Sequence, residues 1–189
     1  FRNTVIPWLA GARSLAGASI LEIGCGTGSS TVALAEQGAS VVAVDVVAES
    51  LEVAKTRCKA YGLDVELFHA NATEAGRLAS GRRFDFIIFF ACLEHMTHEE
   101  RMLAMKQTWD MLGPGGLWCV IETPNRLWYY DGHTSFLPFY LWLPDDLAFQ
   151  YSRFSPRPSF SGSYREPSEE AELSFLRRGR GVSFHEFDL

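Results

Sequence analysis

The chain has 189 residues, 47% of them hydrophobic, and a formal net charge of −6 at pH 7. That length and apolar content suffice for one sizeable hydrophobic core, so we expect a single domain, residues 1–189. The acidic balance, without a lysine or arginine stripe, argues against a nucleic-acid partner. The longest apolar run, residues 136–143, is too short to cross a bilayer. Four cysteines without C-x-x-C spacing predict reduced thiols and a cytoplasmic location.

Strand-like and helix-like segments alternate over the first two thirds of the chain. The apolar runs predict strands over residues 19–23, 41–45, 65–68, 84–90 and 117–121. Helical patterns cover 29–37, 48–61 and 97–112, and the turn Gly113–Gly116 closes the last of them. The alternation predicts an α/β fold, a doubly wound, mostly parallel sheet with helices on both faces. Ligands of such sheets bind at the carboxyl ends of the strands.

The segment Leu21-Glu-Ile-Gly-Cys-Gly-Thr-Gly28 runs from the first strand into the first helix of this alternation. Glycines at alternate positions allow positive φ angles and the close approach of a ligand to the backbone. A dinucleotide fingerprint would need G-x-G-x-x-G, and its third glycine would fall on Ser29. The pattern is instead acidic-x-G-x-G-x-G, with Glu22 in the lead.

This glycine pattern resembles motif I of the class I S-adenosylmethionine-dependent methyltransferases. The segment 84–96, which ends in Leu-Glu-His-Met, resembles motif IV of that family, and the likeness extends over roughly residues 19–123. The order of motifs is similar to the ubiquinone- and menaquinone-biosynthesis enzymes and to small-molecule and sugar O-methyltransferases. The resemblance implies a Rossmann-like fold, S-adenosyl-L-methionine as cofactor and methyl transfer to a small-molecule acceptor.

The resemblance also implies roles for individual residues of the cofactor site. Glu22 would hold the ammonium group of the cofactor, and Asp45 would accept hydrogen bonds from both ribose hydroxyls. Asn71 stands where the family usually has aspartate, so it either faces the adenine amino group or is an ordinary loop residue. The implied cofactor-binding residues are Glu22, Gly24, Cys25, Gly26, Gly28, Asp45, Val46, Asn71, Ala72, Phe90 and Ala91.

Two residues are the predicted catalytic groups on the acceptor side. His95 would be a general base for a hydroxyl acceptor, or it would only close the cofactor pocket. Glu122 would orient His95 or bind a substrate hydroxyl, with a loop cap as the alternative. We expect no metal ion, and we interpret His133 as a surface residue and Glu94 as a turn cap. A hydroxyl acceptor is favoured, and carbon and nitrogen acceptors stay open.

The pattern changes after residue 125. Residues 127–167 predict an aromatic-rich insertion after the fifth strand, most simply an acceptor lid. A hydrophobic cover of the sheet and a membrane-surface role are the alternatives, and acidic residues nearby argue against membrane contact. Ser168 is a candidate N-cap, and residues 182–187 predict a sixth strand. The family's seventh strand is missing, so we expect a longer polypeptide or a partner chain to complete the sheet.

Two other functions are compatible with the same residues. The strand–glycine–helix pattern followed by Asp45 is also found in NAD-linked oxidoreductases, against which Ser29 and the Leu-Glu-His segment argue. A non-catalytic S-adenosylmethionine-binding module would keep Glu22, the glycines and Asp45 but lack an acceptor site.

Overall fold

The structure is a computed structural model that describes residues 1–78, 81–162 and 168–187. The chain divides into two compact units, Phe1–Ala91 with Leu103–Ile121 and Cys92–Met102 with Glu122–Leu189. We describe each unit by itself. The single domain over residues 1–189 stays a prediction, and residues 163–167 of the predicted insertion lie outside the described residues.

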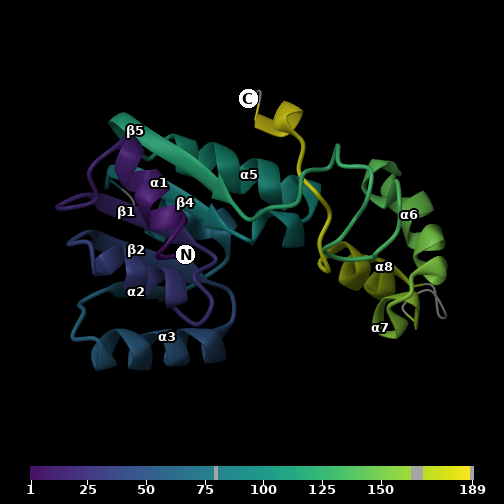
Figure 1. Ribbon diagram of the computed structural model, residues 1–189, viewed down its shortest axis with the longest axis horizontal. Helices are drawn as coiled ribbons and strands as arrows, with labels where there is room; N and C mark the ends of the chain where they lie inside the picture. The colour runs from purple at the N-terminus through teal and green to yellow at the C-terminus, as the bar shows by residue number, and fades with distance from the viewer. Residues whose placement is uncertain (79–80, 163–167, 188–189) are drawn as a thin grey trace. The chain divides into compact units, whose positions relative to one another are not determined.

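The first unit contains a parallel five-stranded sheet in the order β3-β2-β1-β4-β5 (Figure 1). Its strands are β1 (Ser19–Ile23), β2 (Ser40–Asp45), β3 (Glu66–His69), β4 (Phe84–Phe90) and β5 (Leu112–Ile121). Its helices are α1 (Val5–Ala12), α2 (Ser29–Ala35), α3 (Ala48–Ala60), η1 (Ala72–Glu74) and α4 (Ala75–Leu78), and most of α5 (His98–Trp109). The predicted α/β fold is confirmed, and the strand order reverses between β1 and β4, where ligands of such sheets bind.

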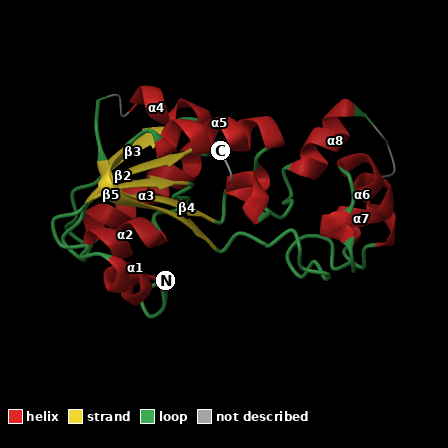
Figure 2. Cartoon of the chain, turned by 90° about the horizontal axis from the view of Figure 1, so that it is seen from above, coloured by secondary structure: helices red, strands yellow, loops and turns green. Residues whose placement is uncertain are grey.

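Helices cover both faces of the sheet, with α1 and α2 on one side and α4 and α5 on the other (Figure 2). Inward-facing β residues such as Ile20, Phe86 and Ile88 are fully buried, and each contributes about 1.5–3 kcal/mol by leaving water. On the α5 side, the ring of Phe89 lies 5.0 Å from that of Trp118. The indole nitrogen of Trp118 donates to Thr108 Oγ1 of α5 at 3.1 Å. Both faces are therefore packed, which explains why the strands are almost continuously apolar.

The junction between α5 and β5 differs from the prediction. The Thr97–Glu100 capping box forms as expected, but α5 ends at Trp109 and not at Leu112. Gly113–Gly116 is not a separate turn, because these residues belong to β5. They form an irregularity in its pairing with β4, where the register shifts between the pairs Phe84↔Leu112 and Phe86↔Leu117. A Cβ on Gly116 would lie 2.9 Å from the carbonyl oxygens of Gly113 and Phe84. Close backbone approach, rather than helix termination, requires glycine there.

The second unit is mostly helical after residue 139. It contains η2 (Leu93–His95), η3 (Tyr140–Trp142), α6 (Asp145–Tyr151), η4 (Ser152–Phe154), α7 (Pro158–Ser161), α8 (Glu169–Leu176) and η6 (Phe184–Phe187). Its core is aromatic, with Tyr140, Phe149 and Phe160 packed around the fully buried Phe175 of α8. Ser168 caps α8 by accepting from the backbone N–H of Ala171 at 3.0 Å, as predicted.

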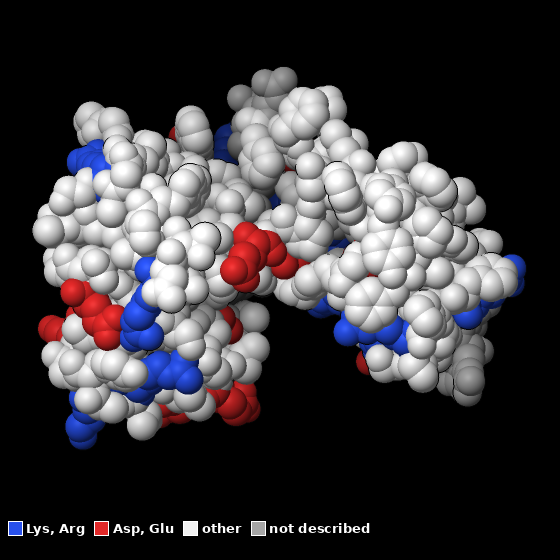
Figure 3. Space-filling view, in the orientation of Figure 1, with Lys and Arg blue, Asp and Glu red and all other residues white. Residues whose placement is uncertain are grey.

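The predicted sixth strand at residues 182–187 is wrong. Only Val182 forms a bridge, to Asn125, and Phe184–Phe187 is the 3₁₀ helix η6. Among the described residues, no helix combines the length and the apolar character that crossing a bilayer requires. On the face drawn in Figure 3, basic and acidic side chains of the first unit are intermixed.

Candidate functional site

The glycine-rich turn follows β1 in the first unit. Gly24 donates its N–H to the carbonyl of Val44 in β2 at 2.8 Å. Gly24, Gly26 and Gly28 have φ angles of +79°, +51° and +77°, which L residues with a Cβ rarely adopt. A Cβ on Gly28 would meet Cβ of Ala54 in α3 at 2.8 Å, whereas one on Gly26 would meet nothing within 4 Å. Gly28 is therefore required by packing, and Gly26 leaves open space above the turn.

Glu22 is fully buried in β1, directly beneath this turn. Its Oε2 accepts a hydrogen bond from Thr31 Oγ1 of α2 at 2.6 Å, while Oε1 is buried and has no partner among the described residues. Burial raises the pKa of the Glu22 carboxyl, the nearby hydroxyls of Ser30 and Thr31 oppose that rise, and the charge of Asp45 adds to it. A buried carboxylate oxygen without a donor is costly, so this atom fits a cationic or N–H group of a ligand.

Asp45 ends β2 on the same sheet edge. One carboxylate oxygen accepts from the N–H of Gly26 at 2.6 Å, and the other accepts from the N–H of Val47 at 2.9 Å. Each carboxylate oxygen has two lone pairs, so both keep one acceptor site for a hydroxyl pair. Asp45 therefore ties the glycine turn to β2 and can also accept from a ligand diol.

The other predicted cofactor residues differ in their surroundings. Asn71 caps η1, since its side-chain oxygen accepts from the N–H of Thr73 at 3.0 Å, which agrees with the loop alternative. Ala72 is buried in η1. Cys25 is buried, and burial raises the pKa of its thiol, with the Glu22 and Asp45 charges adding to the rise. Val46 is exposed.

Phe90 and Ala91 follow at the end of β4. Ala91 has a φ angle of +46°, and its N–H donates to the carbonyl of Ile121 at 2.9 Å. The ring of Phe90 lies edge-on to Phe1, with 5.2 Å between the centroids. The left-handed backbone of a non-glycine residue is uncommon, and such residues cluster at binding and catalytic sites. The chain thus leaves the sheet at Ala91 with a strained backbone that the hydrogen bond to Ile121 holds in place.

The two predicted catalytic residues, His95 and Glu122, belong to the second unit. His95 Nδ1 lies 2.8 Å from the carbonyl oxygen of Arg177. Because a carbonyl only accepts, Nδ1 carries the proton, and Nε2 has a free lone pair in the neutral ring. Glu122 is exposed, with a φ angle of +58°. The structure records no hydrogen bond or ion pair between these two residues within the part of the chain that it describes. Their roles stay predictions.

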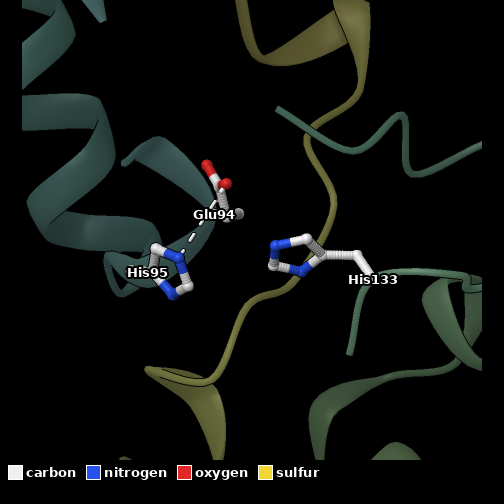
Figure 4. Close-up of side chains that lie close together, drawn as sticks. All are labelled: Glu94, His95 and His133. Atoms are coloured by element: carbon white, nitrogen blue, oxygen red, sulfur yellow. Dashed lines mark ion pairs between the residues drawn. The ribbon is translucent and has the colours of Figure 1, made fainter. Parts of the chain in front are cut away.

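His95 is instead grouped with Glu94 and His133 (Figure 4). One ligand atom from each of the three lies within 4.8 Å of the other two. Glu94 is completely buried: Oε2 accepts from Thr123 Oγ1 at 3.1 Å, and Oε1 has no hydrogen-bond partner among the described residues. His95 Nε2 lies 3.9 Å from that Oε1. The interpretation of Glu94 as a turn cap is therefore wrong, because Oε2 accepts from the Thr123 side chain and Oε1 accepts from no backbone N–H among the described residues.

Sequence reasoning missed that Glu94 and His133 lie close together with His95. His133 is exposed, as expected of a surface residue, but its ring centroid lies 5.9 Å from that of His95. His95 and His133 are far apart in the sequence, and His133 lies in a segment without regular periodicity. The sequence signal that could have indicated this cluster is the adjacent pair Glu94-His95 together with His133 in the aromatic segment.

The geometry of the first unit defines a Rossmann-like domain with a glycine turn and two acidic groups at its ligand edge. A profile of the methyltransferase domain family matches residues 20–116. The chain belongs to this family, that of the class I S-adenosylmethionine-dependent methyltransferases.

The chain is similar in sequence to the ubiquinone biosynthesis O-methyltransferases of Rhizobium etli and Brucella melitensis. It is 36% identical to the first over 115 residues, with 61% of this chain and 44% of the relative covered. It is 37% identical to the second, with 60% and 44% covered. The chain thus covers less than half of the length of these relatives.

Solved structures agree with the fold. An S-adenosylmethionine-dependent methyltransferase from Clostridium acetobutylicum superposes with a TM-score of 0.55 at 23% identity, over 62% of this chain and 47% of that one. The magnesium protoporphyrin IX methyltransferase of Synechocystis, crystallised with S-adenosylmethionine, gives a TM-score of 0.51 at 24% identity, over 59% and 52%. At these identities the likeness supports the Rossmann-like fold.

Proposed function

We propose that the chain binds S-adenosyl-L-methionine in its first unit and transfers the methyl group to a hydroxyl of a small molecule. The observation that carries the proposal is the buried, donor-less Oε1 of Glu22 beneath the glycine turn. Family membership supports the cofactor, and the names of the sequence relatives, O-methyltransferases, support an oxygen acceptor.

The residues of the first unit divide the binding between them. Glu22 would pair with the ammonium group of the cofactor, and Thr31 holds its carboxylate in place at 2.6 Å. Asp45 would take the ribose hydroxyls on the acceptor sites that Gly26 and Val47 leave open. Gly24 and Gly26 carry no side chain, so a ligand could approach the backbone closely at these two positions. The bound cofactor supplies a methyl group already activated on a sulfonium, so the protein mainly aligns the groups and excludes water.

The acceptor side rests on residues of the second unit. His95 is our proposed base, supported by the Arg177 carbonyl that fixes the proton on Nδ1 and leaves Nε2 as an acceptor. Glu122 is our proposed second group, through its carboxylate, and the exposure of that residue leaves it accessible to a substrate hydroxyl. The aromatic segment 127–142 is the proposed acceptor lid.

Calorimetry tests the cofactor first. We expect S-adenosylhomocysteine to bind the chain and raise its unfolding temperature, and NADH to do neither. The reverse result would favour the oxidoreductase alternative. Incubation with labelled S-adenosylmethionine and a panel of phenols, sugars and amines, followed by mass spectrometry, then tests transfer. Cofactor binding without transfer to any class of acceptor would favour the non-catalytic module.

Two finer proposals accompany this function. Within the described residues, β5 pairs only with β4, and we propose that a further chain segment or a partner chain pairs with its other edge, because an open apolar edge exposes unpaired backbone groups. Amide exchange along Leu117–Ile121 with and without added partner tests this. A cytoplasmic location is proposed because Cys25, Cys58 and Cys119 carry free thiols in the described part of the chain.

A further inference from the structure

Three lone-pair donors converge in the second unit without a hydrogen-bond donor between them. They are Glu94 Oε1, His95 Nε2 and a ring nitrogen of His133 (Figure 4). Glu94 has no solvent exposure, and its Oε1 lacks a partner among the described residues. A buried carboxylate oxygen that faces two other acceptors is strongly unfavourable unless a cation or a proton lies between them.

The hydrogen bonds around the cluster determine which nitrogens face inward. His95 Nδ1 donates to the Arg177 carbonyl at 2.8 Å, so Nε2 is the free nitrogen of the neutral ring. His133 Nδ1 lies 2.9 Å from Thr134 Oγ1. That hydroxyl is also 3.0 Å from the carbonyl oxygen of Gly179, to which it donates its only proton. The hydroxyl oxygen therefore accepts from His133 Nδ1, and Nε2 is free here too.

The surroundings hold all three side chains in these orientations. Thr123 Oγ1 donates to Glu94 Oε2 and directs Oε1 toward the histidines. The ring of His133 packs on Gly179, where a Cβ would lie 3.2 Å from Nδ1 and Cε1. Oriented imidazoles with an N–H bonded to an outer acceptor, beside a hydrogen-bonded carboxylate, are the usual arrangement around a protein-bound metal.

Three arginines of the second unit pair with carboxylates other than that of Glu94. Arg101 pairs with Glu186 at 2.6 Å. Arg177 pairs with Glu100 at 2.7 Å and Arg180 with Asp145 at 3.1 Å. These ion pairs leave the charge of Glu94 without an arginine partner among the described residues. A bound cation would thus supply the positive charge that the Glu94 carboxylate lacks.

We propose that Glu94, His95 and His133 form a binding site for a divalent transition-metal ion of the Zn²⁺ class, held by two imidazole nitrogens and one carboxylate oxygen. Two histidines and one glutamate are a donor set that such ions prefer, and three protein ligands leave one position for an oxygen ligand. Nε2 of His95 and Oε1 of Glu94 are 3.9 Å apart, and ligands about 2.0–2.1 Å from a tetrahedral ion lie roughly 3.4 Å apart. For this pair an adjustment of about half an ångström suffices, whereas the separations that involve His133, which are within 4.8 Å, can require up to about 1.4 Å.

The proposal uses none of the cofactor residues, so it stands or falls independently of cofactor binding. A metal ion bound to Nε2 would use the lone pair that His95 needs to accept a proton, so His95 would be a metal ligand and not a general base. The oxygen ligand in the open position, water or a substrate hydroxyl, would then lose its proton to solvent more readily because the metal stabilises the anion.

Metal titration of the untagged chain tests the site. The metal-free protein is titrated with Zn²⁺ by calorimetry and with Co²⁺ by visible absorption. We expect one equivalent to bind, with a Co²⁺ spectrum of four-coordinate nitrogen and oxygen ligands and a rise in unfolding temperature. His133→Ala and Glu94→Gln should each lower the affinity at least about 100-fold, since even outer-shell changes cost 10–100-fold.

His98→Ala is the matched control, because the His98 side chain is 70% exposed and lies outside the cluster. It should leave the affinity unchanged within about twofold, well below the 10–100-fold that follows loss of even an outer-shell partner. Thr123→Val, which removes the outer hydrogen bond, should lower affinity about tenfold. Circular dichroism checks that each variant folds. Absence of binding, or binding that survives both His133→Ala and Glu94→Gln in folded protein, would overturn the proposal.

Discussion

Thr31 in α2 donates its hydroxyl to the buried carboxylate of Glu22 in β1, with 2.6 Å between the oxygens. This bond fixes Oε2 of Glu22, whereas Oε1 has no partner at hydrogen-bond geometry among the described residues. An acid fully removed from water beneath a glycine turn lowers the stability of the ligand-free fold. A cationic ligand group would offset that cost. The buried Glu22 carboxylate is therefore better explained by ligand binding than by a contribution to the stability of the fold.

Replacing Glu22 by glutamine should separate these two effects. Glu22→Gln keeps the shape and removes the charge, so the ligand-free variant should be at least as stable as the parent at neutral pH. Its affinity for S-adenosylhomocysteine should fall by about 1.5–3 kcal/mol, the value of a hydrogen bond to a charged group. Calorimetric titration measures the affinity, and thermal unfolding measures the stability. A less stable variant with unchanged affinity would contradict the assignment.

The same residue predicts a pH dependence. Burial raises the pKa of Glu22 in the folded chain above its ordinary value of 4.5. The folded state therefore holds this proton to higher pH than the unfolded state does, and the contribution of Glu22 to stability falls as pH rises from about 4.5 through the raised pKa. The stability of Glu22→Gln relative to the parent should grow over that window. Unfolding temperatures of both proteins across the pH range check this, and saturating S-adenosylhomocysteine should reduce the difference.

Asp45 should contribute to cofactor binding through both of its oxygens. Asp45→Ala removes two acceptors, so we expect a loss of about 1–3 kcal/mol in affinity for S-adenosylmethionine. Because Asp45 also accepts from the N–H groups of Gly26 and Val47, Asp45→Asn is the better matched variant. It keeps one acceptor oxygen and should lose less. Unchanged affinity in both variants, measured by calorimetry, would remove Asp45 from the site.

The sheet and its glycine turn were predictable because local patterns specify them. Apolar runs at strand spacing and the acidic-x-G-x-G-x-G pattern are contiguous in sequence, and four of the predicted strand ranges lie within one residue of the observed ones. The Gly113–Gly116 segment was misread because glycine serves both turns and close strand approach. Only the 2.9 Å distance from a Cβ on Gly116 to the Phe84 carbonyl oxygen distinguishes the two.

The second unit was less predictable because its contacts are long-range. Residues 182–187 have strand-like composition, but a strand needs a neighbour to pair with, and only Val182 finds one, at Asn125. The Glu94–His95–His133 cluster depends on the path of the chain after β5, and the hydrophobic periodicity of the sequence does not predict that path. Pairing a lone histidine with an acid 39 residues earlier requires the folded chain.

A buried ion pair should be important for the stability of the second unit. Arg101 and Glu186 lie 2.6 Å apart, and their side chains are 4% and 9% exposed. Arg101→Met would leave Glu186 charged and without this partner, so we expect a destabilisation of about 3–5 kcal/mol. The double variant Arg101→Met with Glu186→Gln should recover part of that loss. Denaturant unfolding measures both, and equal loss in the single and double variants would show that the pair is not coupled.

Alanine at Gly28 should mainly lower folding stability, whereas alanine at Gly26 should mainly lower cofactor affinity. Gly28→Ala places a Cβ 2.8 Å from Cβ of Ala54 at a φ of +77°, so packing and backbone strain together should cost about 2–4 kcal/mol of folding stability. Gly26→Ala meets nothing within 4 Å at a φ of +51°, so only backbone strain of about 1 kcal/mol applies.

The reverse order should hold for binding, measured on folded protein at low temperature. The Cβ of Gly26→Ala projects into the open space above the turn, where we propose that the cofactor lies. Its affinity for S-adenosylhomocysteine should fall at least about tenfold, because the ligand can no longer approach the backbone closely. Folded Gly28→Ala should lose less affinity, since its Cβ points at α3 and not at that space. Equal affinity of Gly26→Ala and the parent chain would place the cofactor away from this turn.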